Sequence, residues 1–387
     1  MKNIGVYLSI GPHAGGSYQY CLSIIDAISN IKKKDIKFTF FIFDKKWKKA
    51  LPLNSKIIRL KKNYFSERII NFLKLLNLPI KLHKLLCFLV SKRIQTINYS
   101  GCSHLIFPSQ EDESINISLD SITTIHDLMH RYERNYEEYN DIEYNKRELS
   151  YLRISKYSNK VLVDSEIGKK QVIKSYKCKK NKIFVLPFTA PKYLAKSKII
   201  DIYTKYKIPK KKFIFYPAQF WEHKNHVNLI KAFDIVKQKE KNIILVLVGK
   251  NKNNLQKVKF EIIKKHLQDN VFILGYINEK DMFTFYKKAS MTCFVSCAGP
   301  TNIPPLEAMS LGCPLICSNV YGMKNQIGNG GILINPKNPK EIASKIIKLL
   351  QNKNLRNKII KNGFDQYKKF NDKKFNYNFK KFFSNSV

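Results

Sequence analysis

The sequence is poor in acidic residues and, among its basic residues, poor in arginine. Its 387 residues include 70 lysines and arginines against 29 acids, which gives a formal net charge of +41. Of those 70 basic residues, 8 are arginine. Because readout of base edges relies on the guanidinium fork, a lysine excess argues against a specific nucleic-acid partner. The charge fits phosphorylated small molecules, an anionic membrane surface, or a lysine-rich codon bias without function.

The sequence also lacks long apolar runs, paired cysteines and a leader pattern. No run reaches the roughly 18 apolar residues needed to span a bilayer. The apolar stretch Ile4–Ile10 has strand length and ends at Gly11-Pro12 without a cleavage site. The eight cysteines are scattered with no C-x-x-C pair, which argues against a disulfide scaffold and indicates a reducing compartment. We therefore expect a cytoplasmic protein.

Two series of alternating strands and helices fill the chain, a pattern typical of parallel, doubly wound sheets. The expected strands are 3–9, 38–43, 104–107, 121–125, 160–163 and 183–186, then 213–216, 243–248, 271–274, 292–295 and 314–317. The expected helices are 17–30, 141–157, 166–176, 225–237, 255–266, 279–288, 305–311 and 339–350, with a helical tail over 355–383.

The pattern predicts an α/β protein with two Rossmann-like domains facing a central cleft. We expect an N-terminal domain over 1–190, a linker rich in proline and lysine over 191–212, and a C-terminal domain over 213–365. A helix over 366–387 is expected to cross back to the N-terminal domain. In open α/β sheets the ligand binds beyond the carboxyl ends of the strands, and the candidate residues lie at such ends.

Two of these candidate positions lie in the first series. Gly15-Gly16 stands between the first strand and the first helix, where backbone N–H groups can approach a phosphate. The spacing is not G-x-G-x-x-G, which argues against a nicotinamide cofactor. His126 follows the strand 121–125 and can bind a polar substrate or move a proton. The alternative for His126 is a structural pair with Asp127.

The other two positions lie in the second series. Lys224 precedes the helix expected from Asn225, so its point charge is suited to a diphosphate, while Asn225 is expected to cap that helix. Glu307 lies in the first turn of a helix that follows Gly299–Asn302 and Pro304-Pro305. Its carboxylate can accept two hydrogen bonds from a ribose diol, or can merely favour the helix dipole.

Together these segments resemble the retaining, GT-B-fold glycosyltransferases of the family-4 type, the glycosyl transferases group 1. The likeness covers nearly the whole chain and is strongest in 213–226 and 271–336, where GPTNIPPLEAMSLGCPLICSN looks like the family signature. The resemblance implies catalytic roles for His126, Lys224 and Glu307. It further implies diphosphate or sugar contacts from Gly15, Gly16, Gln219, Lys224, Gly299, Thr301, Asn302 and Ile303, and nucleotide contacts from Gly249, Tyr276, Ile277 and Glu307.

Two positions depart from the family pattern. Gly299 stands eight residues before Glu307, where the family usually has an acid that contacts the donor sugar. Gln219 stands where the family usually has a second basic residue beside the lysine. We expect the backbone N–H groups of Thr301 and Asn302 to replace the acid, and we expect the loss of one charge at the diphosphate.

The resemblance implies transfer of a hexose, with mannose as the first candidate, from a GDP-, UDP- or dTDP-sugar to a saccharide or lipid-linked saccharide acceptor. It implies retention of anomeric configuration, no cofactor, no metal, and a place in O-antigen (lipopolysaccharide) or capsule biosynthesis. Residues 61–95 interleave basic and large apolar side chains. They predict either an anionic membrane surface at the cytoplasmic face of the inner membrane, or a helix pair with a solvated basic face.

Other functions remain open at this stage. A sugar-nucleotide epimerase of the same fold would rearrange its substrate without an acceptor. A catalytically degenerate GT-B module would act as an assembly partner and would bind no nucleotide sugar. A nucleic-acid-binding protein would explain the charge but not Lys224 and Glu307 at matching strand ends. A phosphorylase would need a pyridoxal lysine, which no segment suggests.

Overall fold

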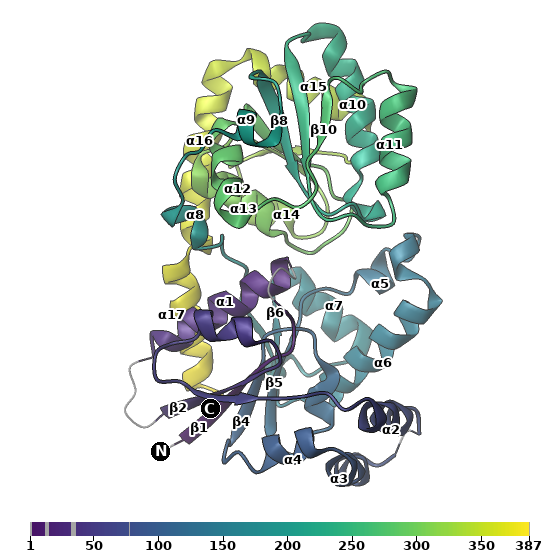
Figure 1. Ribbon diagram of the computed structural model, residues 1–387, viewed down its shortest axis with the longest axis vertical. Helices are drawn as coiled ribbons and strands as arrows, with labels where there is room; N and C mark the ends of the chain where they lie inside the picture. The colour runs from purple at the N-terminus through teal and green to yellow at the C-terminus, as the bar shows by residue number, and fades with distance from the viewer. Residues whose placement is uncertain (1, 12–14, 32–35, 77, 387) are drawn as a thin grey trace. The chain divides into compact units, whose positions relative to one another are not determined.

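The computed structural model describes residues 2–11, 15–31, 36–76 and 78–386, and the chain divides into two compact units (Figure 1). The first unit contains Met1–Leu128, Tyr144–Pro187 and Phe375–Val387, and the second contains Met129–Glu143 and Phe188–Lys374. Residues 129–143, which we placed in the N-terminal domain, therefore cluster with the second unit. The C-terminal residues 375–387 cluster with the first.

The first unit is built on a seven-stranded parallel sheet in the order β3-β2-β1-β4-β5-β6-β7. Its central strands are buried on both faces, as expected for a parallel sheet covered by helices. The register pairs Tyr7 with Phe41 and Val6 with Ile106. The strands are β1 (Lys2–Leu8), β2 (Ile36–Ile42), β3 (Lys56–Arg59), β4 (His104–Phe107), β5 (Asp120–Ile125), β6 (Lys160–Val163) and β7 (Ile183–Val185).

Seven α-helices accompany this sheet in the described part of the chain. They are α1 (Gly16–Ser29), α2 (Tyr64–Leu75), α3 (Ile80–Val90), α4 (Lys92–Asn98), α6 (Asp141–Tyr157), α7 (Glu166–Tyr176) and α17 (Asp372–Ser384). The C-terminal α17 lies beside α1, where Asn376 donates to Asp26 over 3.1 Å and Phe375 contacts the ring of Tyr20 (Figure 1). Burial of Phe375, Phe379, Phe382 and Phe383 attaches α17 to this unit.

The second unit is built on a six-stranded parallel sheet in the order β10-β9-β8-β11-β12-β13. All six residues of β9 are buried, which matches its unbroken run of branched apolar residues. The strands are β8 (Lys212–Pro217), β9 (Ile243–Val248), β10 (Val271–Ile273), β11 (Met291–Phe294), β12 (Leu315–Ser318) and β13 (Ile332–Ile334).

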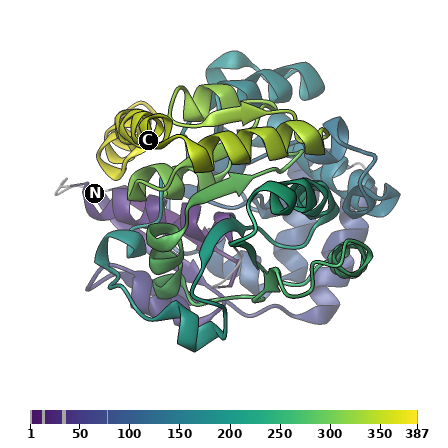
Figure 2. The same ribbon diagram turned by 90° about the horizontal axis from the view of Figure 1, so that it is seen from above.

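Two groups of helices pack beside this second sheet. In one group α10 (His226–Lys239) packs on α11 (Leu255–Lys264) and α15 (Pro339–Gln351). In the other α12 (Glu279–Lys288) contacts α8 (Tyr193–Lys196), α9 (Ile202–Tyr206) and α13 (Ile303–Leu311), and α13 contacts α16 (Lys353–Tyr367). Figures 1 and 2 show the strands running between the two groups. The short helices α5 (Met129–Tyr132) and α14 (Met323–Ile327) complete the unit.

Two strands and the C-terminal tail are among the elements that differ from those expected. The strands β3 and β13 were not predicted, because they span four and three residues and neither is fully buried. The tail expected as one helix over 355–383 is two helices, since α16 ends at Tyr367 and α17 begins at Asp372. Asn371 starts the second helix by accepting from the backbone N–H of Lys374 over 2.9 Å. Among the described residues, no helix is long and apolar enough to cross a membrane.

Candidate active site

Lys224 lies at the carboxyl edge of the second sheet, in the loop between β8 and α10. The hydroxyl of Tyr216 donates to the carbonyl of Lys224, and the N–H of Lys224 donates to the carbonyl of Trp221 over 3.1 Å. Asn225 follows in the left-handed region with φ of 63°. Its side chain does not cap α10 as we expected, because its amide donates to the carbonyls of Val295 (3.1 Å) and Pro336 (2.7 Å). These bonds tie the Lys224 loop to the ends of neighbouring strands.

The ammonium of Lys224 reaches the loop between β11 and α13. Its Nζ lies 3.3 Å from Oδ1 of Asn302 and 3.4 Å from Oγ of Ser296. It also stands over the ring of Phe294, 5.6 Å from the centroid, in cation–π contact. The structure therefore brings Lys224 together with the 299–302 loop, which lies more than 70 residues away in sequence.

Gly299 has a backbone conformation that residues with a side chain rarely adopt. Its φ is 111°, and a Cβ on it would lie 2.9 Å from Nδ2 of Asn302. An acid at position 299 would need another loop conformation, so the departure from the family pattern is built into the backbone. The side-chain amide of Asn302 lies against Gly299 and beside Lys224 instead.

Asn302 is also held at its backbone, by Gln326 of α14. The N–H of Asn302 donates to Oε1 of Gln326 over 3.0 Å, and Nε2 of Gln326 donates back to the carbonyl of Asn302 over 2.8 Å. We expected the N–H of Asn302 to contact the donor sugar, but in the structure it donates to Gln326. The side chain of Asn302 is the group that faces Lys224. Thr301 and Ile303 beside it are both buried.

Glu307 is buried in α13 and carries two tyrosine partners. The hydroxyl of Tyr193 donates to Oε1 over 3.2 Å, and that of Tyr286 donates to Oε2 over 2.5 Å. Burial raises the pKa of Glu307 to about 7, although both hydrogen bonds act to lower it. The carboxyl is thus poised between its two protonation states near neutral pH. Nothing in the sequence marks either tyrosine, since they lie 114 and 21 residues from Glu307.

The other residues expected at the donor in the second unit lie just after the carboxyl ends of β8, β9 and β10. Gly249 packs so closely that a Cβ would lie 2.1 Å from the carbonyl oxygen of Ala218, so backbone packing alone requires glycine there. Gln219 accepts from the indole N–H of Trp221 over 3.0 Å. Tyr276 is half exposed with the ammonium of Lys250 over its ring at 5.4 Å, and Ile277 is buried.

His126, Gly15 and Gly16 belong to the first unit. His126 is buried with its ring edge-on to Tyr20 at 4.9 Å. Burial lowers the pKa of His126 to about 4, so the imidazole is neutral at pH 7. Asp127 forms an ion pair with Arg147 at 3.7 Å. Gly15 precedes α1 with φ of 65°, and α1 begins at Gly16. Residues 12–14 of the expected glycine loop lie outside the described residues.

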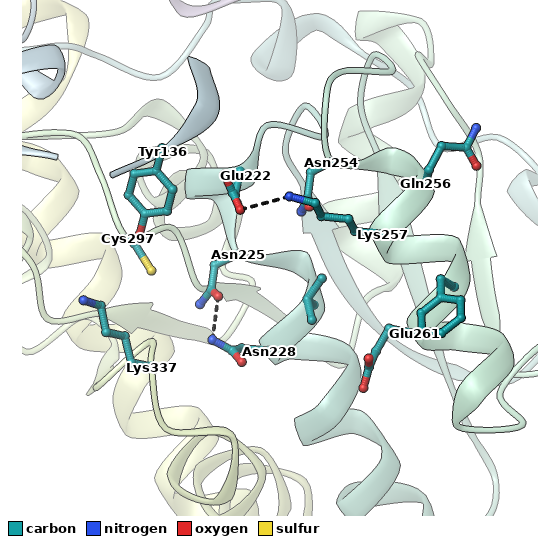
Figure 3. A pocket seen from close by; sticks show the side chains of 12 residues that line it. Tyr136, Glu222, Asn225, Asn228, Asn254, Gln256, Lys257, Glu261, Cys297 and Lys337 are labelled. Carbon is teal, nitrogen blue, oxygen red and sulfur yellow. Dashed lines mark hydrogen bonds and ion pairs between the residues drawn. The ribbon is translucent and has the colours of Figure 1, made fainter. Parts of the chain in front are cut away.

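A cavity of about 810 Å³ opens between the starts of α10 and α11 (Figure 3). Asn225 and Asn228 point toward each other in it, and Lys257 points toward Glu222 (Figure 3). None of its lining residues is one that we predicted at the donor, so this cavity and the Lys224–Asn302 pair are separate features. Within the described ranges, no three His, Cys, Asp or Glu side chains gather closely enough to hold a metal ion.

Part of the chain matches a known protein family. Residues 199–366 match the family model described as glycosyl transferases group 1. The matched segment contains Lys224, Asn302 and Glu307, whereas Gly15, Gly16 and His126 lie outside it.

Individual proteins extend the likeness over more of the chain. The O-antigen chain mannosyltransferase B of Escherichia coli is 22% identical over 259 residues, which cover 63% of this chain and 68% of that protein. The sucrose-phosphate synthase structure from Thermosynechococcus elongatus superposes with a TM-score of 0.76 at 17% identity, over 100% of this chain and 99% of the other. Anabaena HepE in complex with UDP-glucose gives 0.73 at 13% identity, over 100% of both chains. The chain has the GT-B fold of these glycosyltransferases.

Proposed function

We propose that the protein is a glycosyltransferase that moves a hexose from a nucleotide sugar to a saccharide or lipid-linked saccharide acceptor. The observation that carries the proposal is the meeting of Lys224, Asn302 and Ser296 at the carboxyl edge of the second sheet, with Glu307 on the helix that follows. The match of residues 199–366 to the group 1 family supports it.

In the proposed reaction, negative charge develops on the departing diphosphate. The Lys224 ammonium would neutralise that charge, and Glu307 would hold the ribose through hydrogen bonds from its hydroxyls. A phosphate oxygen of the leaving group would take the proton of the acceptor hydroxyl on the same face. The anomeric configuration is then retained. In the first unit, the imidazole of His126 is neutral at pH 7. We propose that this chemistry needs no metal.

The donor is proposed from the relatives. A relative named as an O-antigen chain mannosyltransferase supports mannose as the first hexose to test, and a neighbour crystallised with UDP-glucose supports UDP beside GDP and dTDP as the carrier. The same relative supports a role in O-antigen biosynthesis. A Staphylococcus aureus relative named as a capsular polysaccharide biosynthesis glycosyltransferase supports capsule as the alternative. We propose that the enzyme works at the cytoplasmic side of the membrane.

We also propose that the enzyme docks on an anionic membrane through the α2–α3 surface. This surface consists of the exposed apolar side chains of Tyr64, Phe65, Phe72, Leu75, Leu82, Leu85 and Leu89, flanked by exposed Lys61, Lys62, Arg68, Lys81 and Lys92. The acid within it, Glu67, pairs with buried Arg93. Apolar side chains ringed by lysines suit the boundary between acyl chains and anionic headgroups. Asn77, between the two helices, lies outside the described residues.

A degenerate module that assists assembly is the second candidate. It is favoured by the neutral Gln219 and by Gly299, each of which stands where the family usually has a charge. This module would bind no nucleotide sugar. An epimerase, the remaining alternative, would convert the donor with no acceptor present.

Loss of Lys224 tests the proposal. We expect Lys224→Ala to lower kcat for donor turnover by about 10²-fold, because it removes a preorganised cation from the leaving group. Lys231→Ala, which removes an exposed lysine from α10, is the matched control and should retain wild-type rates. The measurement is release of nucleoside diphosphate from GDP-, UDP- and dTDP-hexoses, with and without a saccharide acceptor. Equal rates for Lys224→Ala and wild type would show that the site is misassigned.

A further inference from the structure

Residues 129–143 pack on the second unit through an apolar cluster, although the chain before and after them belongs to the first unit. Met129 and Tyr139 are buried against Ala298, the residue that precedes Gly299. Tyr132, Tyr136 and Tyr321 surround them, and the hydroxyl of Tyr321 donates to the carboxylate of Glu133. This packing places the acid Glu138 against the β8–α10 loop.

Glu138 makes three hydrogen bonds to the loops at the carboxyl edge of the second sheet. Its Oε1 accepts from the backbone N–H of His223 over 3.1 Å and from the ring Nδ1 of the same residue. Its Oε2 accepts from Nδ2 of Asn253 over 3.0 Å. Burial acts to raise the pKa of Glu138, but these hydrogen bonds outweigh it and lower the pKa to about 2. Because the carboxylate is ionised it can only accept, so Nδ1 of His223 carries the proton.

His223 is held from its other sides as well. Its carbonyl accepts from the N–H of Cys297 over 2.8 Å, and its ring stacks on Tyr139 with centroids 6.0 Å apart. Both backbone polar groups of His223 are therefore engaged, one by Glu138 and one by the end of the β11 segment. Its carbonyl belongs to the peptide bond that leads into Lys224. The position of the Lys224 backbone thus depends directly on how His223 is held.

We propose that Glu138 is a positioning residue, which fixes the His223–Lys224 peptide so that the Lys224 ammonium stays at the loop of Ser296 and Asn302. The role of Lys224 itself rests on the proposed function. A cation stabilises developing charge best when it need not be reorganised during the reaction. Charge-assisted hydrogen bonds donated to the carboxylate of Glu138, whose side chain is 6% exposed, provide such rigidity. Glu138 lies 86 residues before Lys224, so the first half of the chain supplies part of the support for a site in the second.

Hydrogen exchange of the full chain tests the positional claim without any ligand. In Glu138→Gln we expect the peptides covering 218–226 to exchange faster than in wild type, because the charged acceptor of the His223 N–H is lost. Glu240→Gln is the matched control. It removes a carboxylate at the end of α10 that accepts from the side chain of Gln351, outside the measured segment, so exchange in 218–226 should match wild type. Unchanged exchange in Glu138→Gln would overturn the proposal.

A double-mutant cycle then tests whether Glu138 acts through Lys224. We expect Glu138→Gln to lower kcat for donor turnover about tenfold, with acceptor KM unchanged, since a small misplacement of a catalytic group is costly. In the Lys224→Ala background the same change should have almost no further effect. A full tenfold loss in that background would mean a general structural role and would contradict the proposal. A wild-type chain with no turnover of any donor would contradict the proposed function, and the exchange result would still decide the positional claim.

Discussion

At the scale of single residues, the partners of a buried side chain determine what that side chain can do. Glu307 is surrounded by apolar neighbours and two tyrosine hydroxyls, so its carboxyl holds a proton far more strongly than an exposed acid. Burial keeps the imidazole of His126 neutral at pH 7. The proposed donor site in the second unit combines a cation, Lys224, with an acid, Glu307, whose charge changes near pH 7.

The raised pKa of Glu307 predicts a specific pH dependence of stability. The folded protein holds the proton up to about pH 7, whereas the unfolded chain releases it near the ordinary value of 4.5. Stability is therefore highest below the unfolded pKa and falls as pH rises through the folded pKa. Between pH 5 and pH 8 the free energy of unfolding of the wild type should fall by on the order of 3 kcal/mol more than that of Glu307→Gln, whose side chain does not titrate. Denaturant unfolding of both proteins at the two pH values measures this difference. An equal change in the free energy of unfolding for wild type and variant would refute the prediction.

Residues also show where prediction from sequence stops. Lys224 and Glu307 could be singled out because a strand, a loop and a helix start are visible around them. The tyrosine partners of Glu307 could not be predicted, because each contact joins segments that meet only after folding. The same holds for Gln326, which bonds Asn302, and for Glu138, which bonds His223. Asn225 shows the same limit, since its place at the start of α10 was predicted but its side-chain partners were not.

At the scale of elements, burial on both faces made the fold predictable. Runs such as Ile243–Val248 read as central parallel strands because every residue is apolar, and all six are buried in β9. The edge strands β3 and β13 were not predicted, because short, half-exposed strands have no continuous apolar run. Helices α2 and α3 were visible as an amphipathic pair. The sequence alone could not decide between a solvated basic face and a surface that contacts a membrane.

The α2–α3 surface can be tested with lipid vesicles. We expect the wild type to sediment with vesicles containing anionic phosphatidylglycerol and to be released by high salt, since the attraction is partly electrostatic. Replacing Phe72 and Leu85 by serine should weaken binding several-fold. The matched control replaces Phe260 and Ile263, two exposed apolar residues of α11 in the second unit, by serine and should bind like wild type. Equal binding by both variants would refute this surface.

At the scale of the whole molecule, the charge of +41 is distributed over both units rather than gathered in the site. Lys224 supplies positive charge in the proposed donor site, and five exposed basic residues supply it on the α2–α3 surface. Some acidic residues form ion pairs within the protein. Asp112 pairs with Lys74, and both Glu67 and Glu113 pair with Arg93. The lysine surplus therefore remains on the surface, where it favours association with anionic partners.

We propose above that the second unit binds a nucleoside diphosphate sugar through Lys224 and Glu307. The most direct measurement is calorimetric titration of the full chain with UDP, GDP and dTDP at pH 8, where the Glu307 carboxyl is ionised. The account predicts that one of the three binds the wild type, and that Glu307→Gln binds it at least tenfold more weakly because the amide is a poorer acceptor for the ribose hydroxyls. Equal affinity in the variant, or no binding of any of the three by the wild type, would contradict it.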